Sequence, residues 1–105
     1  MNTPADWEPR IQRLEALNAD MLERARSDEW DAVIEREQAR QTLLEELFRQ
    51  PAPEAVAPRL ADAVRATLTS DERVQELARG EMQRLSDALK ALNQGRRALH
   101  AYQTP

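Results

Sequence analysis

The residues able to do acid–base or nucleophilic chemistry are few in this chain and poorly placed for it. There is no Cys, and the one His, His100, lies near the C-terminal end, four residues after Arg96. Without Cys the chain has no disulfide, no thiolate metal site and no thiol nucleophile. We therefore expect His100 to be a solvated or docking residue rather than a catalytic one.

Carboxylates are abundant, but many stand three or four residues before an arginine. Such pairs lie on one helical face and stabilise a helix by about 0.2–0.5 kcal/mol each. They are Asp20–Arg24, Glu45–Arg49, Asp62–Arg65 and Glu76–Arg79. A carboxylate-bridged metal site between helices needs a Glu-x-x-His motif, which the chain lacks. The pattern favours a binding or structural protein over an enzyme and predicts no metal or other cofactor.

The composition favours an all-α fold. The 105 residues fit one domain, are rich in Ala, Leu, Glu, Arg and Gln, and include only two Gly. The polar N-terminus has no apolar run typical of a signal peptide, and no segment approaches the roughly 20 apolar residues of a membrane span. We expect a single cytoplasmic domain over residues 1–105, folded as an antiparallel three-helix bundle with a long third helix and a short C-terminal helix.

Hydrophobic periodicity predicts the first helix over about 5–26 and the second over about 28–49. The first helix carries one apolar stripe. The members of the stripe are Trp7, Ile11, Leu14, Asn18, Met21, Leu22 and Ala25, with Leu17 at its edge. The very short connection to the second helix predicts an antiparallel hairpin.

The second helix is expected to begin beside Ser27, whose side chain is of the type that caps a helix N-terminus. Its predicted inner face holds apolar residues at both ends and polar ones in the middle. The members of this face are Trp30, Val33, Ile34, Glu37, Gln41, Leu44 and Phe48. We expect Trp30 to be buried, and Glu37 and Gln41 to form a polar seam that fixes helix register, or else to face a partner.

A loop with three prolines, residues 50–58, precedes a third helix predicted over about 57–92. Thr69 and Glu72 have the spacing of a capping box, which would start a new helix there. The apolar phase hardly slips across them, so one long helix is the preferred interpretation. At 1.5 Å per residue, the roughly 34 residues from Arg59 to Leu92 span about 51 Å, more than the hairpin can cover. Part of the apolar stripe of this third helix is therefore predicted to meet another chain, a tail or a second copy. The members of the stripe are Leu60, Val64, Leu68, Val74, Leu77, Met82, Leu85, Leu89 and Leu92.

Asn93-Gln94-Gly95 has the composition of a helix end, with Gly95 at the left-handed cap, and 96–103 is predicted to be a short docking helix. Residues 27–50 carry a net charge of −4, whereas 96–105 hold two arginines and no acid. Our hypothesis is that this tail docks on the second helix. Arg96 and Arg97 would pair with the acidic residues of the second helix, while Leu99 and Tyr102 cover the apolar stripe of the third helix.

Three segments resemble the FliT-type flagellar export chaperones. The acidic-Trp-Asp-x-x-Ile-x-x-Glu run within 27–41 resembles their first loop and second helix, and 71–85 resembles their third helix. Leu99-His100-Ala101-Tyr102 is similar to the Leu-x-Ala-Tyr of their C-terminal helix. The order and spacing of these segments match the family over almost the whole chain.

The resemblance implies a chaperone of the bacterial cytosol that binds the C-terminal segment of the filament cap protein. It would prevent premature assembly and deliver the cap subunit to the export ATPase and the export gate. In some members the flagellar master regulator of transcription is a second partner. The family's binding groove maps onto Leu60, Val64, Leu68, Val74 and Gln75. The helix that masks this groove maps onto Leu99 and Tyr102.

A second interpretation remains open from the residues alone. The long third helix is also typical of a homodimeric helical adaptor without a chaperone role. The net charge of −4 argues against direct binding of a nucleic-acid backbone.

Overall fold

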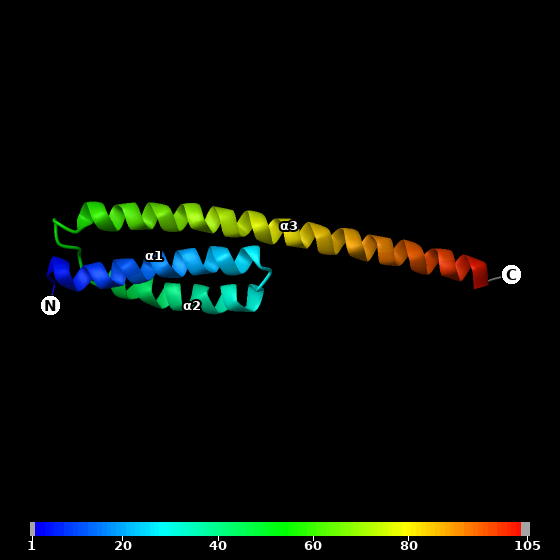
Figure 1. Ribbon diagram of the computed structural model, residues 1–105, viewed down its shortest axis with the longest axis horizontal. Helices are drawn as coiled ribbons and strands as arrows, with labels where there is room; N and C mark the ends of the chain where they lie inside the picture. The colour runs from blue at the N-terminus through cyan, green and yellow to red at the C-terminus, as the bar shows by residue number, and fades with distance from the viewer. Residues whose placement is uncertain (1, 104–105) are drawn as a thin grey trace. The chain divides into compact units, whose positions relative to one another are not determined.

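A computed structural model describes residues 2–103, and all regular structure in that range is helical. The helices are α1 (Pro4–Arg26), α2 (Trp30–Leu47) and α3 (Ala57–Gln103). Figure 1 shows α1 and α2 running in opposite directions, with the first part of α3 beside them. The all-α prediction is confirmed.

The start of α1 is fixed by Thr3 and Asp6. The Asp6 carboxylate accepts hydrogen bonds from the Thr3 amide at 3.1 Å and from the Thr3 hydroxyl at 2.8 Å. These bonds hold the pKa of Asp6 below its ordinary value. A carboxylate in the first turn also lies at the positive end of the helix dipole. Thr3 and Asp6 thereby set where the hairpin begins.

The prediction that Ser27 caps the second helix is wrong, because Ser27 ends α1. The Asp28 amide donates to Ala25 O at 3.2 Å, and the Glu29 amide donates to Arg24 O at 2.9 Å. With φ of 59° at Asp28, these bonds form a Schellman-type C-terminus. Residues 27–29 form the turn between the two helices, so α2 begins at Trp30 and not at residue 28. It ends at Leu47 and not at residue 49.

The apolar core lies where α1, α2 and the start of α3 meet. Its members come from all three helices and from the loop before α3. They are Trp7, Ile11, Leu14, Leu17, Leu43, Leu47, Val56, Leu60 and Ala63. Burial of these side chains provides the main favourable term for folding. The predicted face of α1 is confirmed except at Leu22, which is only half-buried.

The residues that α2 buries differ from those of the predicted inner face. Val33, Arg40, Leu43 and Leu47 are the buried residues of α2. Ile34 is 58% exposed, Phe48 lies beyond the helix end at 59%, and Trp30 is only half-buried. Gln41 is exposed as well, so the polar group at the centre of the interface is the guanidinium of Arg40.

The third helix is continuous from Ala57 to Gln103. The preferred interpretation of one helix through residues 69–72 is confirmed, and the Thr69 hydroxyl donates to Arg65 O at 3.2 Å instead of capping a new helix. The predicted end at 93–95 and the separate C-terminal helix are wrong. No glycine has positive φ in the described range, so Gly95 continues the helix.

The chain divides into two compact units, one ending at Gln75 and one beginning at Glu76. The apolar core belongs to the first unit. In the second unit every described residue from Met82 onward is exposed.

Candidate functional site

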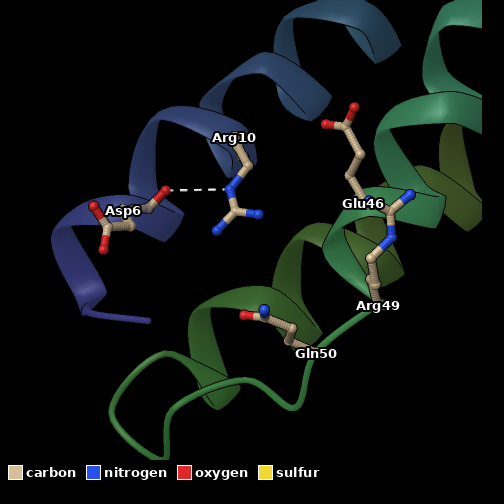
Figure 2. Close-up of a pocket in the computed structure, with 5 residues that line it drawn as sticks. All are labelled: Asp6, Arg10, Glu46, Arg49 and Gln50. Atoms are coloured by element: carbon tan, nitrogen blue, oxygen red, sulfur yellow. Dashed lines mark hydrogen bonds between the residues drawn. The ribbon is translucent and has the colours of Figure 1, made fainter. Parts of the chain in front are cut away.

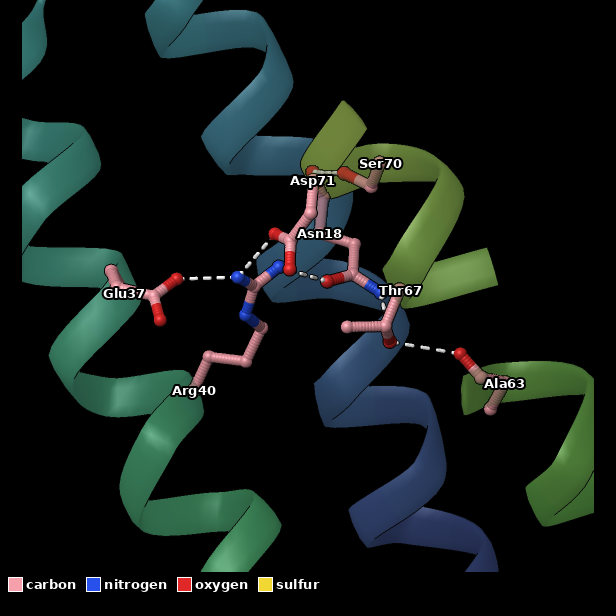
Figure 3. A network of polar contacts seen from close by, with 7 residues as sticks. All are labelled: Asn18, Glu37, Arg40, Ala63, Thr67, Ser70 and Asp71. Atoms are coloured by element: carbon pink, nitrogen blue, oxygen red, sulfur yellow. Dashed lines mark hydrogen bonds and ion pairs between the residues drawn. The ribbon is translucent and has the colours of Figure 1, made fainter. Parts of the chain in front are cut away.

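A polar network joins the three helices in the first unit, and Figure 3 shows it from close by. Asn18 of α1 donates from Nδ2 to the hydroxyl of Thr67 at 2.9 Å, and the Thr67 hydroxyl donates in turn to Ala63 O at 2.8 Å. Arg40 of α2 donates from Nη1 to Asn18 Oδ1 at 2.9 Å. The three side chains are buried, so each bond satisfies a polar group that water does not reach.

The other terminal nitrogen of Arg40 binds two carboxylates. Nη2 donates to Glu37 Oε2 and to Asp71 Oδ1, the latter at 2.5 Å. Arg40 is 3% exposed, whereas both carboxylates are partly exposed. A buried cation shared by two half-solvated anions leaves a local charge of −1 at this end of the interface.

Next to the network lies a mainly apolar groove of about 330 Å³ between α2 and α3. Met21 of α1 contributes to its lining and is itself 2% exposed. The remaining lining residues are Val33, Ile34, Glu37, Gln38, Arg40, Asp71, Val74 and Gln75. The groove thus combines apolar side chains with the acidic side of the Arg40 network.

The structure separates the five residues for which the sequence predicted partner binding. Val74 and Gln75 line the groove. Leu60 is 7% exposed and belongs to the core, and Val64 packs against the core. Leu68 is exposed and does not line the groove.

Of the α1 and α2 residues that line the groove, sequence reasoning considered only Glu37 as a partner-facing residue. Met21 and Val33 were assigned to the core, and Ile34 was expected to be buried. Asp71 was noted only within the segment 71–85 of the family resemblance. The acid-rich composition around Trp30 was the available signal that α2 has an acidic surface.

A second hollow, of about 480 Å³, is polar and lies near the start of α1 and the end of α2 (Figure 2). Arg10 stacks over the Trp7 ring at 4.8 Å and donates from Nε to Asp6 O at 3.2 Å. Besides Gln50, the lining holds two arginines and two acids, which are Arg10, Arg49, Asp6 and Glu46. The formal charges cancel, so the hollow favours no class of charged ligand.

The second unit presents an exposed apolar stripe of its own. Its members are Met82, Leu85, Leu89, Leu92 and Leu99. Of the predicted masking residues, Arg96 and Arg97 are exposed and line a hollow with His100 and Ala101, and Tyr102 is 91% exposed. Exposed apolar patches of this kind mark interaction surfaces.

Neither a metal centre nor a membrane span is present in the part of the chain that the structure describes. No group of three or more His, Cys, Asp or Glu side chains there has the placement to hold a metal ion. No helix within residues 2–103 has the length and apolar character to cross a membrane.

The fold and the groove define a small all-helical protein whose distinctive surfaces are apolar and partly acidic. The family model described as "Flagellar protein FliT" matches residues 8–104. The chain therefore belongs to the FliT family of flagellar export chaperones. Searches among curated proteins and among solved structures found no match.

Proposed function

We propose that this protein is the cytoplasmic chaperone of the flagellar filament cap protein and that the groove between α2 and α3 binds the C-terminal segment of that client. The three helices would serve as an antiparallel bundle that carries the groove. Bound client would be unable to assemble early and would be handed to the export ATPase and the export gate. The flagellar master regulator is proposed as a further partner.

The observation that carries the proposal is the exposure of one large apolar side chain, Ile34, at the groove. Ile34 is 58% exposed although it lies on the same wall as buried Val33. Across the groove, half-buried Val74 comes from α3. An amphipathic helix that docks in a groove uses such apolar walls to bury its own apolar face.

Calorimetric titration of the full chain with a synthetic C-terminal segment of the cap protein tests the proposal. Ile34→Ser should weaken binding by about tenfold, which corresponds to roughly 1.4 kcal/mol. Phe48→Ser is the matched control, since Phe48 is equally exposed but does not line the groove. Equal affinities for all three proteins would show that the client binds elsewhere, and absence of binding to the wild-type chain would reject this client.

We also propose that Arg96, Arg97, Leu99 and Tyr102 mask the binding surface in the absence of client. Exposed ion pairs contribute about 0–1 kcal/mol each, so such docking would be weak and reversible. Because α3 is continuous through Gly95, the proposed masking segment is the end of α3 and not a separate helix. Deleting residues 95–105 should tighten client binding, and unchanged affinity would reject the masking role.

Self-association is the second candidate function, and the exposed stripe of the second unit favours it. Met82, Leu85, Leu89 and Leu92 follow one another at steps of three and four residues, the spacing of a helix–helix seam. Light scattering of the purified chain distinguishes the two functions. A dimer that persists in the presence of client, without client binding, would support the homodimeric adaptor.

A further inference from the structure

We propose that the segment bound in the α2–α3 groove carries a lysine or arginine beside its apolar anchor, and that this cation binds between Glu37 and Asp71. The inference rests on the proposed function, because it specifies the chemistry of the client at the same groove. It assigns to the two carboxylates a role in recognition in addition to their contacts with Arg40.

The first argument is the hydrogen bonding of the two carboxylates. Glu37 uses Oε2 and Asp71 uses Oδ1 to accept from the same nitrogen of Arg40. The second oxygen of each group, Glu37 Oε1 and Asp71 Oδ2, has no hydrogen bond to any described residue. The side chains are 46% and 37% exposed, and both line the groove, so the two carboxylates are partly open to solvent there.

The second argument is charge. Two anions share one cation, so the cluster has a formal charge of −1, and a second cation would neutralise it. The surroundings act in the same direction. Up to Gln75 the chain has sixteen acidic residues and ten arginines, a net charge of −6. A positively charged segment is therefore attracted to this unit before it makes contact.

The third argument is the shape of a lysine or arginine side chain. Its methylene stem is apolar and its head is charged, so it lies along apolar surface with the head in a polar environment. The groove has both kinds of surface, because the apolar side chains of Ile34 and Val74 line it together with the carboxylates of Glu37 and Asp71. An apolar side chain of the client and the methylene stem of a neighbouring lysine or arginine would cover the apolar part of the groove, and the charged head would bind the carboxylates.

Other occupants fit the same surfaces less well. An acidic segment would meet two carboxylates, while Arg40 is 3% exposed and already shared. A wholly apolar segment would remove water from the free carboxylate oxygens without replacing their hydrogen bonds, which is unfavourable. A metal ion would need more ligands than this pair, and the described residues offer no group of three.

The test is a set of binding cycles on the full chain. The probe is the synthetic cap-protein segment, in which each arginine is replaced in turn by citrulline and each lysine by acetyl-lysine. One replacement should weaken binding to the wild-type chain about tenfold and should have less than a twofold effect on binding to Glu37→Gln. The matched control is Glu45→Gln, which removes the same charge from an exposed position of α2 outside the groove. The tenfold effect should persist there.

Asp71→Asn provides a second cycle that tests the same cation from the α3 side. Circular dichroism of each variant establishes that the helices are retained. Replacements that leave affinity within twofold, or that act equally on wild type and both variants, would overturn the inference. If the segment binds and Ile34→Ser weakens it while the charge cycles show no coupling, only this inference fails. If the segment does not bind at all, the proposed function fails and the inference fails with it.

Discussion

Replacing Arg40 tests whether the polar network stabilises the first unit. Arg40 donates to Asn18, Glu37 and Asp71 and is 3% exposed. Arg40→Met keeps an apolar side chain of similar length but removes all three bonds. Asn18 is buried, so its Oδ1 then loses the donor that satisfies it. The two carboxylates are partly exposed and turn to water instead.

The expected cost follows from which groups are left unsatisfied. A buried acceptor without a partner costs about 1–3 kcal/mol. Loss of the buried cation relieves its desolvation, which offsets much of the lost attraction to the carboxylates. We therefore expect Arg40→Met to lower the free energy of unfolding by about 2 kcal/mol. Arg40→Ala should lower it by about 1.5 kcal/mol more, because the apolar atoms beyond Cβ that Met retains lose their packing.

Urea unfolding followed by Trp fluorescence measures this cost, since both tryptophans lie in the first unit. Arg65→Met is the control. That arginine is exposed and pairs with Asp62 on the helix surface, so its loss should cost under about 0.5 kcal/mol. Asn18→Leu combined with Arg40→Met removes donor and acceptor together and should show a coupling of about 1 kcal/mol. If Arg40→Met matches the control, or if no coupling appears, the reasoning about Asn18 is refuted.

Three further predictions follow from burial, backbone and pKa. Leu47→Ala should cost about 3 kcal/mol in urea unfolding because Leu47 is fully buried, whereas exposed Leu92→Ala should cost under about 0.5 kcal/mol. Gly95→Ala should raise helix content and thermal stability, by up to about 1 kcal/mol, since the added Cβ would meet no group within 4 Å outside its own stretch of helix backbone and its chain neighbours; a decrease would indicate a left-handed cap. The Arg59 hydrogen bond lowers the pKa of Glu15 from its ordinary 4.5, so the stabilisation is present above that pH and is lost as pH falls through the depressed pKa; Glu15→Gln should flatten this part of an acid unfolding curve.

The helices themselves were predictable because their signals are local. In α1 the large apolar residues repeat at helical spacing from Trp7 to Met21, and the structure buries that face. The apolar residues keep their helical spacing across Thr69 and Glu72, and this correctly predicted one helix in spite of the capping pattern. The same local reasoning failed at Gly95, where the cap signal was the stronger one. Glycine is tolerated inside a helix at a cost of about 1 kcal/mol, so its presence did not require an end.

The inner face of α2 was not predictable from its own residues. Ile34 and Phe48 are apolar, so a sequence pattern places them on the buried face. An arginine is rarely buried unless it is paired, so Arg40 was not placed there. The partner that makes burial of Arg40 acceptable is Asp71, 31 residues away on another helix. Such a pairing leaves no periodic signal in the sequence of either helix. Of the residues that line the candidate groove, the sequence therefore indicated partner binding only for Val74 and Gln75 and, as one alternative, for Glu37.

Asp71 helps to hold α3 against the hairpin and also lines the groove. Two substitutions near it should therefore affect stability and client affinity to different degrees. Beyond Ala63 and Val64, α3 is held to the hairpin by polar bonds from Thr67, Ser70 and Asp71. Arg40→Met removes the buried partner of this attachment and should lower stability more than affinity for the cap-protein segment. Glu37→Gln leaves the Asp71–Arg40 bond in place and removes only one accessible charge, so it should lower affinity more than stability. Measuring urea unfolding and binding for both variants checks the contrast. Losses that run in parallel in the two proteins would mean that the network acts on binding through folding alone.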